Sequence, residues 1–126
     1  MNTESMRTIL VVEDEHDTAE LYGEMLQASG FRVVKAPDTK TAIGLLDREP
    51  PDAILLDIMM PDISGLEVAG YIRREPKLAH IPVIIVSART LPKDIQTGLD
   101  AGARLYLTKP VSFLELKKAV EAVLSA

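Results

Sequence analysis

The chain has 126 residues and no cysteine, and its 14 basic and 19 acidic side chains give a formal net charge of −5. This length suits one domain with a core of its own, and the lack of thiols excludes disulfides, thiolate metal sites and a cysteine nucleophile. The basic side chains are scattered, which argues against nucleic acid as a direct ligand. No apolar run approaches the roughly 18 residues of a membrane span, and residues 1–8 lack a secretory apolar region, so we expect a cytoplasmic protein without a membrane anchor.

The first predicted unit is a strand over Thr8–Val12 followed by a helix that begins near Asp17. Gly30 supplies the stop of this helix. Its apolar residues recur at helical spacing: Leu21, Tyr22, Met25 and Leu26.

The second and third units repeat this pattern. A strand over Phe31–Lys35 precedes Asp38, a residue type that caps helix N-termini, and Pro50 ends the helix that follows. The third strand, Ala53–Leu56, runs directly into Asp57, and a loop then leads to the next helix. The apolar positions of these two helices are Ala42, Leu45 and Leu46, and then Leu66, Ala69 and Ile72.

The last two units are shorter in their strands. Val83–Val86 and Leu105–Leu107 are the fourth and fifth predicted strands, with a short helix between them that carries Ile95 and Leu99. The final helix opens with Ser112 and Glu115 in the spacing of a capping box. Its apolar stripe consists of Phe113, Leu116, Val120, Val123 and Leu124.

These units predict a doubly wound α/β fold with a five-stranded parallel sheet. Strands that are apolar throughout are expected to be buried on both faces, and helical crossovers between them make neighbouring strands parallel. For five β-α units of this size, we expect the strand order 2-1-3-4-5. Residues 1–126 then form a single domain, with a flexible N-terminus over residues 1–6.

Polar side chains stand at four strand ends, where an open parallel sheet binds its ligands. They are Glu13, Asp14 and Glu15, then Asp57, Ser87 and Lys109. Adjacent carboxylates repel unless a proton or a cation lies between them, and hard oxygen ligands suit Mg²⁺. Taken alone, the acidic run would be a solvated turn before a helix, and Ser87 and Lys109 would be ordinary strand-end residues. Asp57 lies at the carboxyl end of a buried strand, where an unpaired charge is costly, so its carboxylate needs a partner. This favours a cation site.

Four segments, VVEDE, LLDIMMPDISG, IIVSA and YLTKP, stand in the same order in the receiver domains of two-component response regulators. The chain resembles this family over nearly its whole length. The resemblance implies a flavodoxin-like, CheY-like (βα)5 fold and a signalling module rather than a conventional enzyme. It also implies a phosphoryl group accepted from a sensor histidine kinase or a histidine phosphotransfer protein.

The resemblance also implies roles for individual residues. Asp57 is the phosphoacceptor, and Lys109 contacts the phosphate after a cis bond to Pro110. Ser87 and Tyr106 form the switch. The ion, Mg²⁺ or Mn²⁺, is held by Asp57, by Asp14, by Glu13 through a water molecule and by the backbone carbonyl of Met59, while Pro61 and Gly65 shape the loop after Asp57. A downstream protein or output domain would contact the face made by the fourth helix, the fifth strand and the fifth helix. The sequence alone leaves open whether the chain acts by itself or within a longer regulator.

Other classes fit the residues less well. A phosphatase or dehalogenase of the haloacid type also uses an aspartate after a buried strand, but it normally has a second aspartate where this chain has Met59. A nucleotide- or flavin-binding module needs a Gly- or Ser/Thr-rich phosphate loop after the first strand, where the acidic run would repel a phosphate. A degenerate receiver that serves only as a binding platform would lack an acidic, acceptor or lysine position, and none is missing here.

Overall fold

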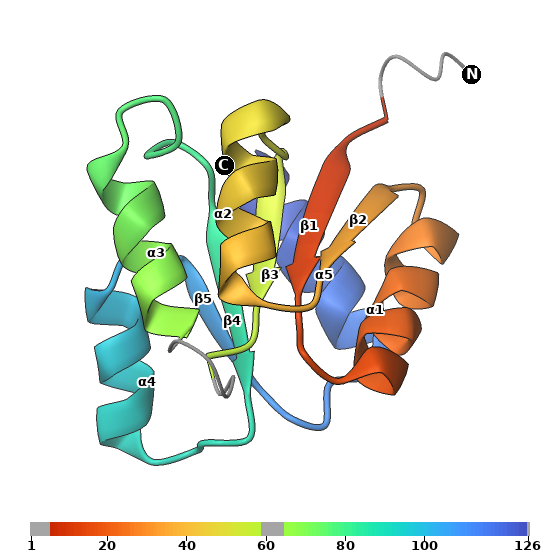
Figure 1. Ribbon diagram of the computed structural model, residues 1–126. Coiled ribbons are helices and arrows are strands. Elements are labelled where there is room, and N and C mark those ends of the chain that lie inside the picture. Colours follow the sequence, from red (N-terminus) through yellow and green to blue (C-terminus); the bar gives the residue numbers. More distant parts are fainter. Residues whose placement is uncertain (1–5, 59–64, 126) are drawn as a thin grey trace.

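The computed structural model describes residues 6–58 and 65–125. Within them, five strands form one parallel sheet in the order β2-β1-β3-β4-β5 (Figure 1). The predicted fold class and strand order are therefore confirmed. The strands are β1 (Thr8–Val12), β2 (Arg32–Ala36), β3 (Ala53–Leu56), β4 (Val83–Ser87) and β5 (Leu105–Thr108).

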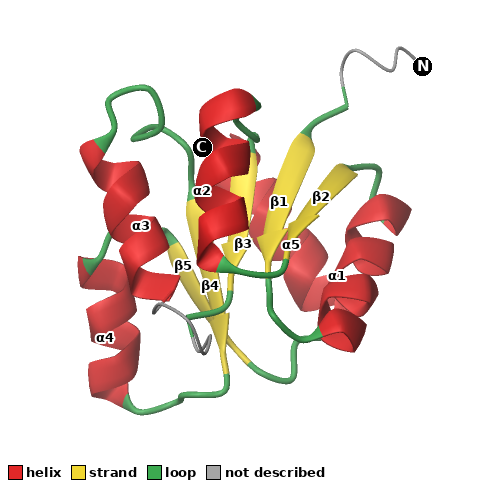
Figure 2. Ribbon diagram, viewed as in Figure 1, coloured by secondary structure: helices red, strands yellow, loops and turns green. Residues whose placement is uncertain are grey.

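Helices cover both faces of the sheet, as Figure 2 shows. The helices α2, α3 and α4 lie on one face, and α1 and α5 lie on the other. They are α1 (His16–Ala28), α2 (Thr39–Arg48), α3 (Gly65–Arg74), α4 (Pro92–Asp100) and α5 (Phe113–Ser125). None of the helices in the described part of the chain is long and apolar enough to cross a membrane.

Local sequence rules explain several helix ends. Asp38 caps α2, because its side chain accepts a hydrogen bond of 2.7 Å from the backbone N–H of Thr41. Ser112 and Glu115 form the predicted capping box of α5, each side chain accepting from the other residue's backbone N–H at 3.1 Å. Gly30 follows α1 with a φ of 95°, a left-handed conformation that favours glycine.

β2 lies one residue later than its predicted range. The N–H of Phe31 bonds to the carbonyl of Leu26 at 3.1 Å, so the backbone of Phe31 closes the turn that follows α1. At the other end, Ala36 pairs with Val12 of β1. The apolar character of Phe31 suggested a strand residue, but the closing turn of the helix uses its backbone.

The core has two parts, one on each face of the sheet. The three inner strands are almost wholly buried, as expected for parallel strands covered on both faces. The edge strands differ from this expectation. β2 and β5 are mostly half-buried or exposed, because each has a neighbouring strand on one side only.

Three apolar residues that the periodicity assigned to helix faces are partly open to solvent. Leu21 on α1 is 49% exposed, Leu99 on α4 is 38% exposed and Phe113 on α5 is 41% exposed. Helical spacing identifies the apolar side of a helix, but it does not tell how far a neighbouring element extends over that side.

Candidate functional site

Two acidic side chains stand next to each other at the carboxyl ends of β1 and β3. Val12 pairs with Leu56, so Glu13 and Asp57 follow neighbouring positions in the sheet, and the N–H of Asp57 bonds to the carbonyl of Val12 at 3.0 Å. Both side chains come from buried strands, and Glu13 and Asp57 are only 3% and 7% exposed. The crowding of carboxylates predicted for this edge is present.

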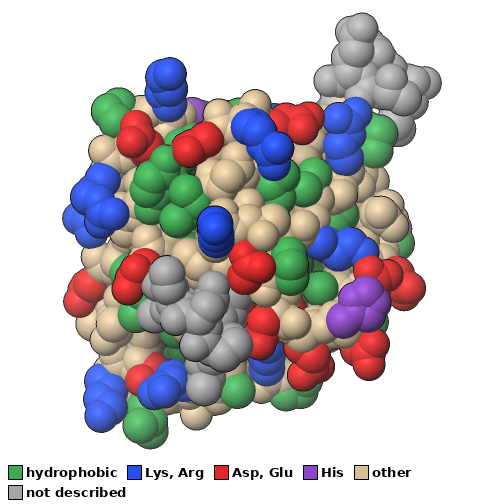
Figure 3. Space-filling view, viewed as in Figure 1, with side chains coloured by type: hydrophobic (Ala, Val, Ile, Leu, Met, Phe, Trp, Pro, Cys, Tyr) green, Lys and Arg blue, Asp and Glu red, His purple; other side chains and the backbone are tan. Residues whose placement is uncertain are grey.

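Asp14 completes a group of three carboxylates. Ligand oxygens of Glu13, Asp14 and Asp57 all lie within 4.8 Å of one another, and Asp14 is open to solvent while the other two are buried. Carboxylate oxygens are hard ligands, and an exposed member leaves room for bound water, which Mg²⁺ prefers to retain. The donor set therefore fits a small divalent cation. Acidic side chains also gather on the surface at the lower right of Figure 3, over the start of α1.

Lys109 brings a positive charge into this group from the end of β5. Its Nζ lies 3.1 Å from Oε1 of Glu13 and 3.2 Å from Oδ2 of Asp57. The N–H of Lys109 bonds to the carbonyl of Ser87 at 2.9 Å, and the bond from Lys109 to Pro110 is cis, as the resemblance implies. The ammonium group is thus held beside Asp57 by residues far apart in the chain.

Ser87 and Tyr106 are joined through the backbone of Arg89. Ser87 is fully buried at the end of β4, and its Oγ accepts a hydrogen bond of 3.1 Å from the N–H of Arg89. The hydroxyl of Tyr106, from β5, donates to the carbonyl of Arg89 at 3.0 Å. The backbone of Arg89, in the segment that leads into α4, is therefore bonded to both side chains.

Comparison with known proteins identifies the family of the chain. Residues 9–121 match the family model of the response regulator receiver domain. The chain belongs to this family. It is therefore a receiver domain of the kind found in two-component response regulators.

The receiver is similar to several known proteins along nearly its whole length. It is 40% identical to an uncharacterized 14.6 kDa protein of Leptolyngbya boryana, over 96% of this chain and 92% of that protein. It is 41% identical to the phosphate regulon transcriptional regulatory protein PhoB of Escherichia coli, over 94% of this chain but only 52% of PhoB, so it spans about half of that relative. In structure it resembles the chemotaxis protein CheY4 of Vibrio cholerae, with a TM-score of 0.90 at 28% identity, over 95% of this chain and all of CheY4.

Burial and neighbouring charges shift the acid–base equilibria of the receiver's site. Burial raises the pKa of Glu13 to about 7, and its hydrogen bond to Asp57 acts in the same direction, partly offset by Lys109. Burial lowers the pKa of Lys109, but the hydrogen bond to Glu13 and the charge of Asp57 outweigh it and leave the pKa above its usual value. Lys109 therefore stays an ammonium at neutral pH.

The raised pKa of Glu13 predicts a pH-dependent stability for the metal-free receiver. The ordinary pKa is 4.5 and the folded value is about 7, so between these values the folded chain holds a proton that the unfolded chain has released. The contribution of Glu13 to stability is thus fully present below about pH 4.5 and is lost as the pH rises through about 7. A Glu13→Gln variant should lack this loss. Urea unfolding in the presence of a chelator should show the variant gaining stability relative to the parent over this range, and parallel pH profiles would contradict the assignment.

One contact and one residue of the site were not found by sequence reasoning. The ion pair between Lys109 and Glu13 joins positions 96 residues apart, and no local pattern reports such a pair. Gly98 on α4 lies against the Tyr106 ring, where a Cβ would come within 2.9 Å of ring atom Cδ2 and of Cδ1 of Ile85. A glycine inside a predicted helix was the available indication, since it weakens the helix unless another element packs closely there.

Two expected contributors lie outside the described residues: Met59, assigned a backbone carbonyl ligand, and Pro61, assigned to the loop. Gly65 is described, and its N–H bonds to the carbonyl of Ile58 at 3.3 Å. A Cβ at Gly65 would lie 2.6 Å from Cα of Ile58 and would also strike the carbonyl of Asp57. The start of α3 can therefore lie against the backbone of Asp57 and Ile58 only because position 65 has no side chain.

Proposed function

We propose that the receiver accepts a phosphoryl group on Asp57 in a reaction that requires Mg²⁺ or Mn²⁺, and that it changes conformation as a result. The observation that carries the proposal is the position of the Asp57 carboxylate. It is nearly buried, within 4.8 Å of the other carboxylates, and its Oδ2 lies 3.2 Å from Nζ of Lys109. A nucleophile, a set of cation ligands and a fixed ammonium group thus share one small site.

The residues have separate tasks in the proposed transfer. A carboxylate oxygen of Asp57 attacks the phosphorus of a phosphohistidine, the phosphorus–nitrogen bond breaks and the imidazole leaves. The Lys109 ammonium offsets negative charge on the phosphoryl oxygens. Asp57, Asp14, Glu13 through a water molecule and the Met59 carbonyl would hold a divalent ion, which would supply further charge neutralisation.

The proposed switch follows from the hydrogen bonds at the end of β4. Once Asp57 carries a phosphoryl group, its oxygens offer acceptors to the hydroxyl of Ser87. Ser87 accepts a hydrogen bond from the N–H of Arg89, and Tyr106 donates one to the carbonyl of Arg89. A shift of Ser87 therefore displaces Arg89 and changes the hydrogen bond that holds the Tyr106 hydroxyl. The size of the response is limited by the difference in interaction energy between the two states.

The proposed partners are a sensor histidine kinase or histidine phosphotransfer protein, and a downstream protein or output domain. The downstream partner would contact α4, β5 and α5. Large apolar side chains at the starts of α4 and α5 are open to solvent, with Leu91 at 56%, Leu114 at 54% and Phe113 at 41% exposure. The net charge of −5 supports a protein rather than nucleic acid as the direct ligand. We further propose that residues 1–126 form one domain and that it works in the cytoplasm.

Incubation with a small phosphodonor tests the proposal. We expect intact-protein mass spectrometry to find one added phosphoryl group per chain when Mg²⁺ is present and none when a chelator replaces it. Reductive labelling of the acyl phosphate followed by peptide mapping should place the group on Asp57. Incorporation that does not depend on the metal, or that maps to another residue, would contradict the proposed function.

A further inference from the structure

Basic side chains stand at the edge of the sheet opposite Asp57, where the strands begin. In Figure 1 the parallel strands start at the upper edge of the sheet, and the carboxyl ends of β1 and β3 lie at its lower edge. Arg7 directly precedes β1, Arg104 directly precedes β5 and His80 comes shortly before β4. The topology that gathers carboxylates at one edge therefore gathers basic groups at the other.

The side chains of Arg7, His80 and Arg104 line one pocket of about 240 Å³. Its other lining residues are Pro51, Asp52, Pro82, Val123 and Leu124. The two prolines and Val123 are buried, whereas the charged side chains are exposed, so an apolar base carries a charged rim. The volume is below the roughly 300 Å³ at which sites for drug-sized ligands begin, and it therefore suits a compact group.

Most of the donors on this rim are not used by the chain itself. Within residues 6–58 and 65–125, no hydrogen bond or ion pair uses the side chain of His80 or of Arg104. Arg7 donates from Nη1 to the carbonyl of Leu124 at 3.0 Å, and a guanidinium group has five N–H donors in all. Two guanidinium groups thus face the pocket with most of their donors available.

Asp52 is the acidic residue of this pocket, and its charge is directed at the backbone. Its Oδ2 accepts a hydrogen bond of 2.7 Å from the N–H of Thr8, and its own N–H bonds to the carbonyl of Thr8 at 2.8 Å. The carboxylate is thereby held at the start of β1 and makes no ion pair with Arg7 or Arg104. The two guanidinium groups outweigh it, so the pocket is positively charged.

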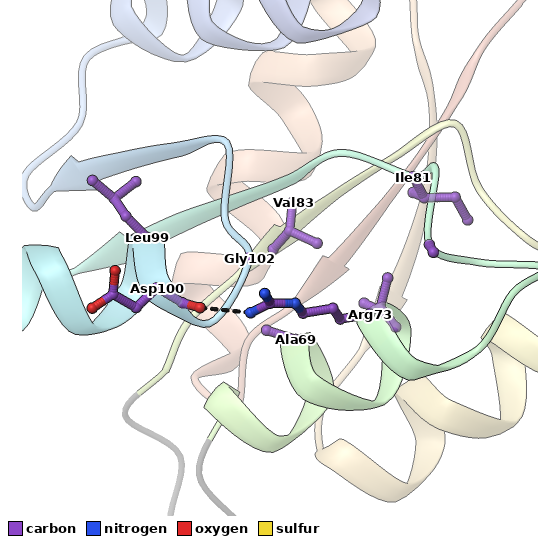
Figure 4. Close-up of a pocket in the computed structure, with 9 residues that line it drawn as sticks. Ala69, Arg73, Ile81, Val83, Leu99, Asp100 and Gly102 are labelled. Carbon is purple, nitrogen blue, oxygen red and sulfur yellow. Dashed lines mark hydrogen bonds between the residues drawn. The ribbon is translucent and has the colours of Figure 1, made fainter.

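The pocket between α3 and the end of α4 shows the opposite case (Figure 4). It is larger, at about 430 Å³, and it also has an arginine in its lining. There the guanidinium of Arg73 donates to the carbonyl of Asp100 at 2.7 Å, so an acceptor within the chain uses this donor. Arg104 has no such acceptor among the described residues, and its donors are available to a ligand from outside.

We propose that the pocket lined by Arg7, His80 and Arg104 binds a phosphate-type oxyanion. A guanidinium group stays charged at physiological pH, and its planar fork matches two oxygens of a phosphate. The imidazole of His80 adds a further N–H donor. Nearby buried apolar groups weaken the screening of these charges by water. Because Arg7 also bonds to Leu124, a bound anion would link the end of α5 to the starts of β1 and β5.

This site is independent of the proposed phosphoryl transfer. It lies at the other edge of the sheet from Asp57 and requires neither a metal ion nor a phosphorylated chain. The net charge of −5 means that the chain as a whole repels anions, so saturable binding of an anion reports local groups rather than the overall field. The proposal goes beyond the receiver activity and can fail without affecting it.

A titration with sodium pyrophosphate, followed by the NMR signals of the imidazole rings, tests the proposal. The full, unphosphorylated chain is first freed of metal by dialysis, and sodium chloride keeps the ionic strength constant at fixed pH. The chain has two histidines, and His16 at the start of α1 is an internal control beside the acidic site. We expect His80 and the amides of residues 7–8 and 104–105 to shift along one saturable curve while His16 stays in place. Inorganic phosphate, with less charge, should shift the same signals at higher concentration.

Substitution of Arg104 identifies the rim as the binding group. Arg104→Gln should weaken pyrophosphate binding by about tenfold, since a charged hydrogen-bond donor is lost, and Arg104→Lys should have a smaller effect. Arg48→Gln is the matched control, because Arg48 lies at the end of α2, on the other face of the sheet and outside the pocket lining. Equal affinities of Arg104→Gln and Arg48→Gln would overturn the proposal. So would His16 shifts as large as those of His80, or shifts that grow without saturation.

Discussion

Replacing Asp57 with asparagine is expected to abolish phosphoryl incorporation from a small phosphodonor in the presence of Mg²⁺. The amide has nearly the shape of the carboxylate, but it lacks the charged oxygen that attacks phosphorus and is a weaker ligand for a hard cation. The loss should be complete within the sensitivity of intact-protein mass spectrometry, whereas the far-ultraviolet circular dichroism spectrum should remain that of a folded α/β protein.

Asp47→Asn is a matched control for this experiment. Asp47 lies on α2, and its Oδ1 accepts a hydrogen bond of 2.6 Å from the hydroxyl of Tyr71, a role that the asparagine carbonyl can fill. The control should be labelled like the parent. If the Asp57→Asn variant were labelled to the same extent as Asp47→Asn, Asp57 would not be the acceptor.

Gly65→Ala is expected to have the largest effect on stability among single methyl additions in the described chain. The new Cβ would lie 2.6 Å from Cα of Ile58, and neither this backbone nor that of Asp57 can move aside as a flexible side chain would. We expect the free energy of unfolding to fall by about 2–4 kcal/mol, since α3 must be displaced from the backbone of Asp57 and Ile58. Urea unfolding monitored by circular dichroism measures the change.

Gly44→Ala is the control for this substitution. Gly44 lies inside α2, and a Cβ there would meet no atom within 4 Å outside its own helix and chain neighbours. Alanine favours the helix over glycine by roughly 0.5–1 kcal/mol, so this variant should be more stable than the parent. Similar unfolding midpoints for Gly65→Ala and the parent would show that α3 does not depend on close approach to the backbone of Asp57 and Ile58.

Features that depend on a few neighbouring residues could be predicted from the sequence by local rules. Asp38 and the pair Ser112 and Glu115 identified helix starts, because their side chains bond to backbone groups three residues away. The short apolar runs separated by helices predicted the parallel sheet. Once the strand order was assumed, Asp57, Asp14 and Lys109 could be placed together at the carboxyl edge of the sheet, where the structure has them.

Features that depend on how elements approach one another could not be predicted in this way. The exposure of Phe113 and Leu21 depends on where the neighbouring elements end, which helical periodicity does not contain. The ion pair from Lys109 to Glu13 and the close contact of Gly98 with Tyr106 arise only when β1, α4 and β5 are assembled. Sequence reasoning therefore found the charged and hydroxyl-bearing residues of the site, but it found neither the contacts among them nor Gly98.

A magnesium titration followed by amide chemical shifts, with and without beryllofluoride as a phosphoryl mimic, determines whether Glu13, Asp14 and Asp57 hold the cation. Mg²⁺ alone should shift the signals of residues 13–14 and 57–58 and of Lys109, and beryllofluoride should extend the changes to Ser87, α4 and β5. Asp14→Asn should weaken the first response. Undiminished Mg²⁺ binding by that variant, or shifts confined to other parts of the chain, would mean that these carboxylates do not hold the cation.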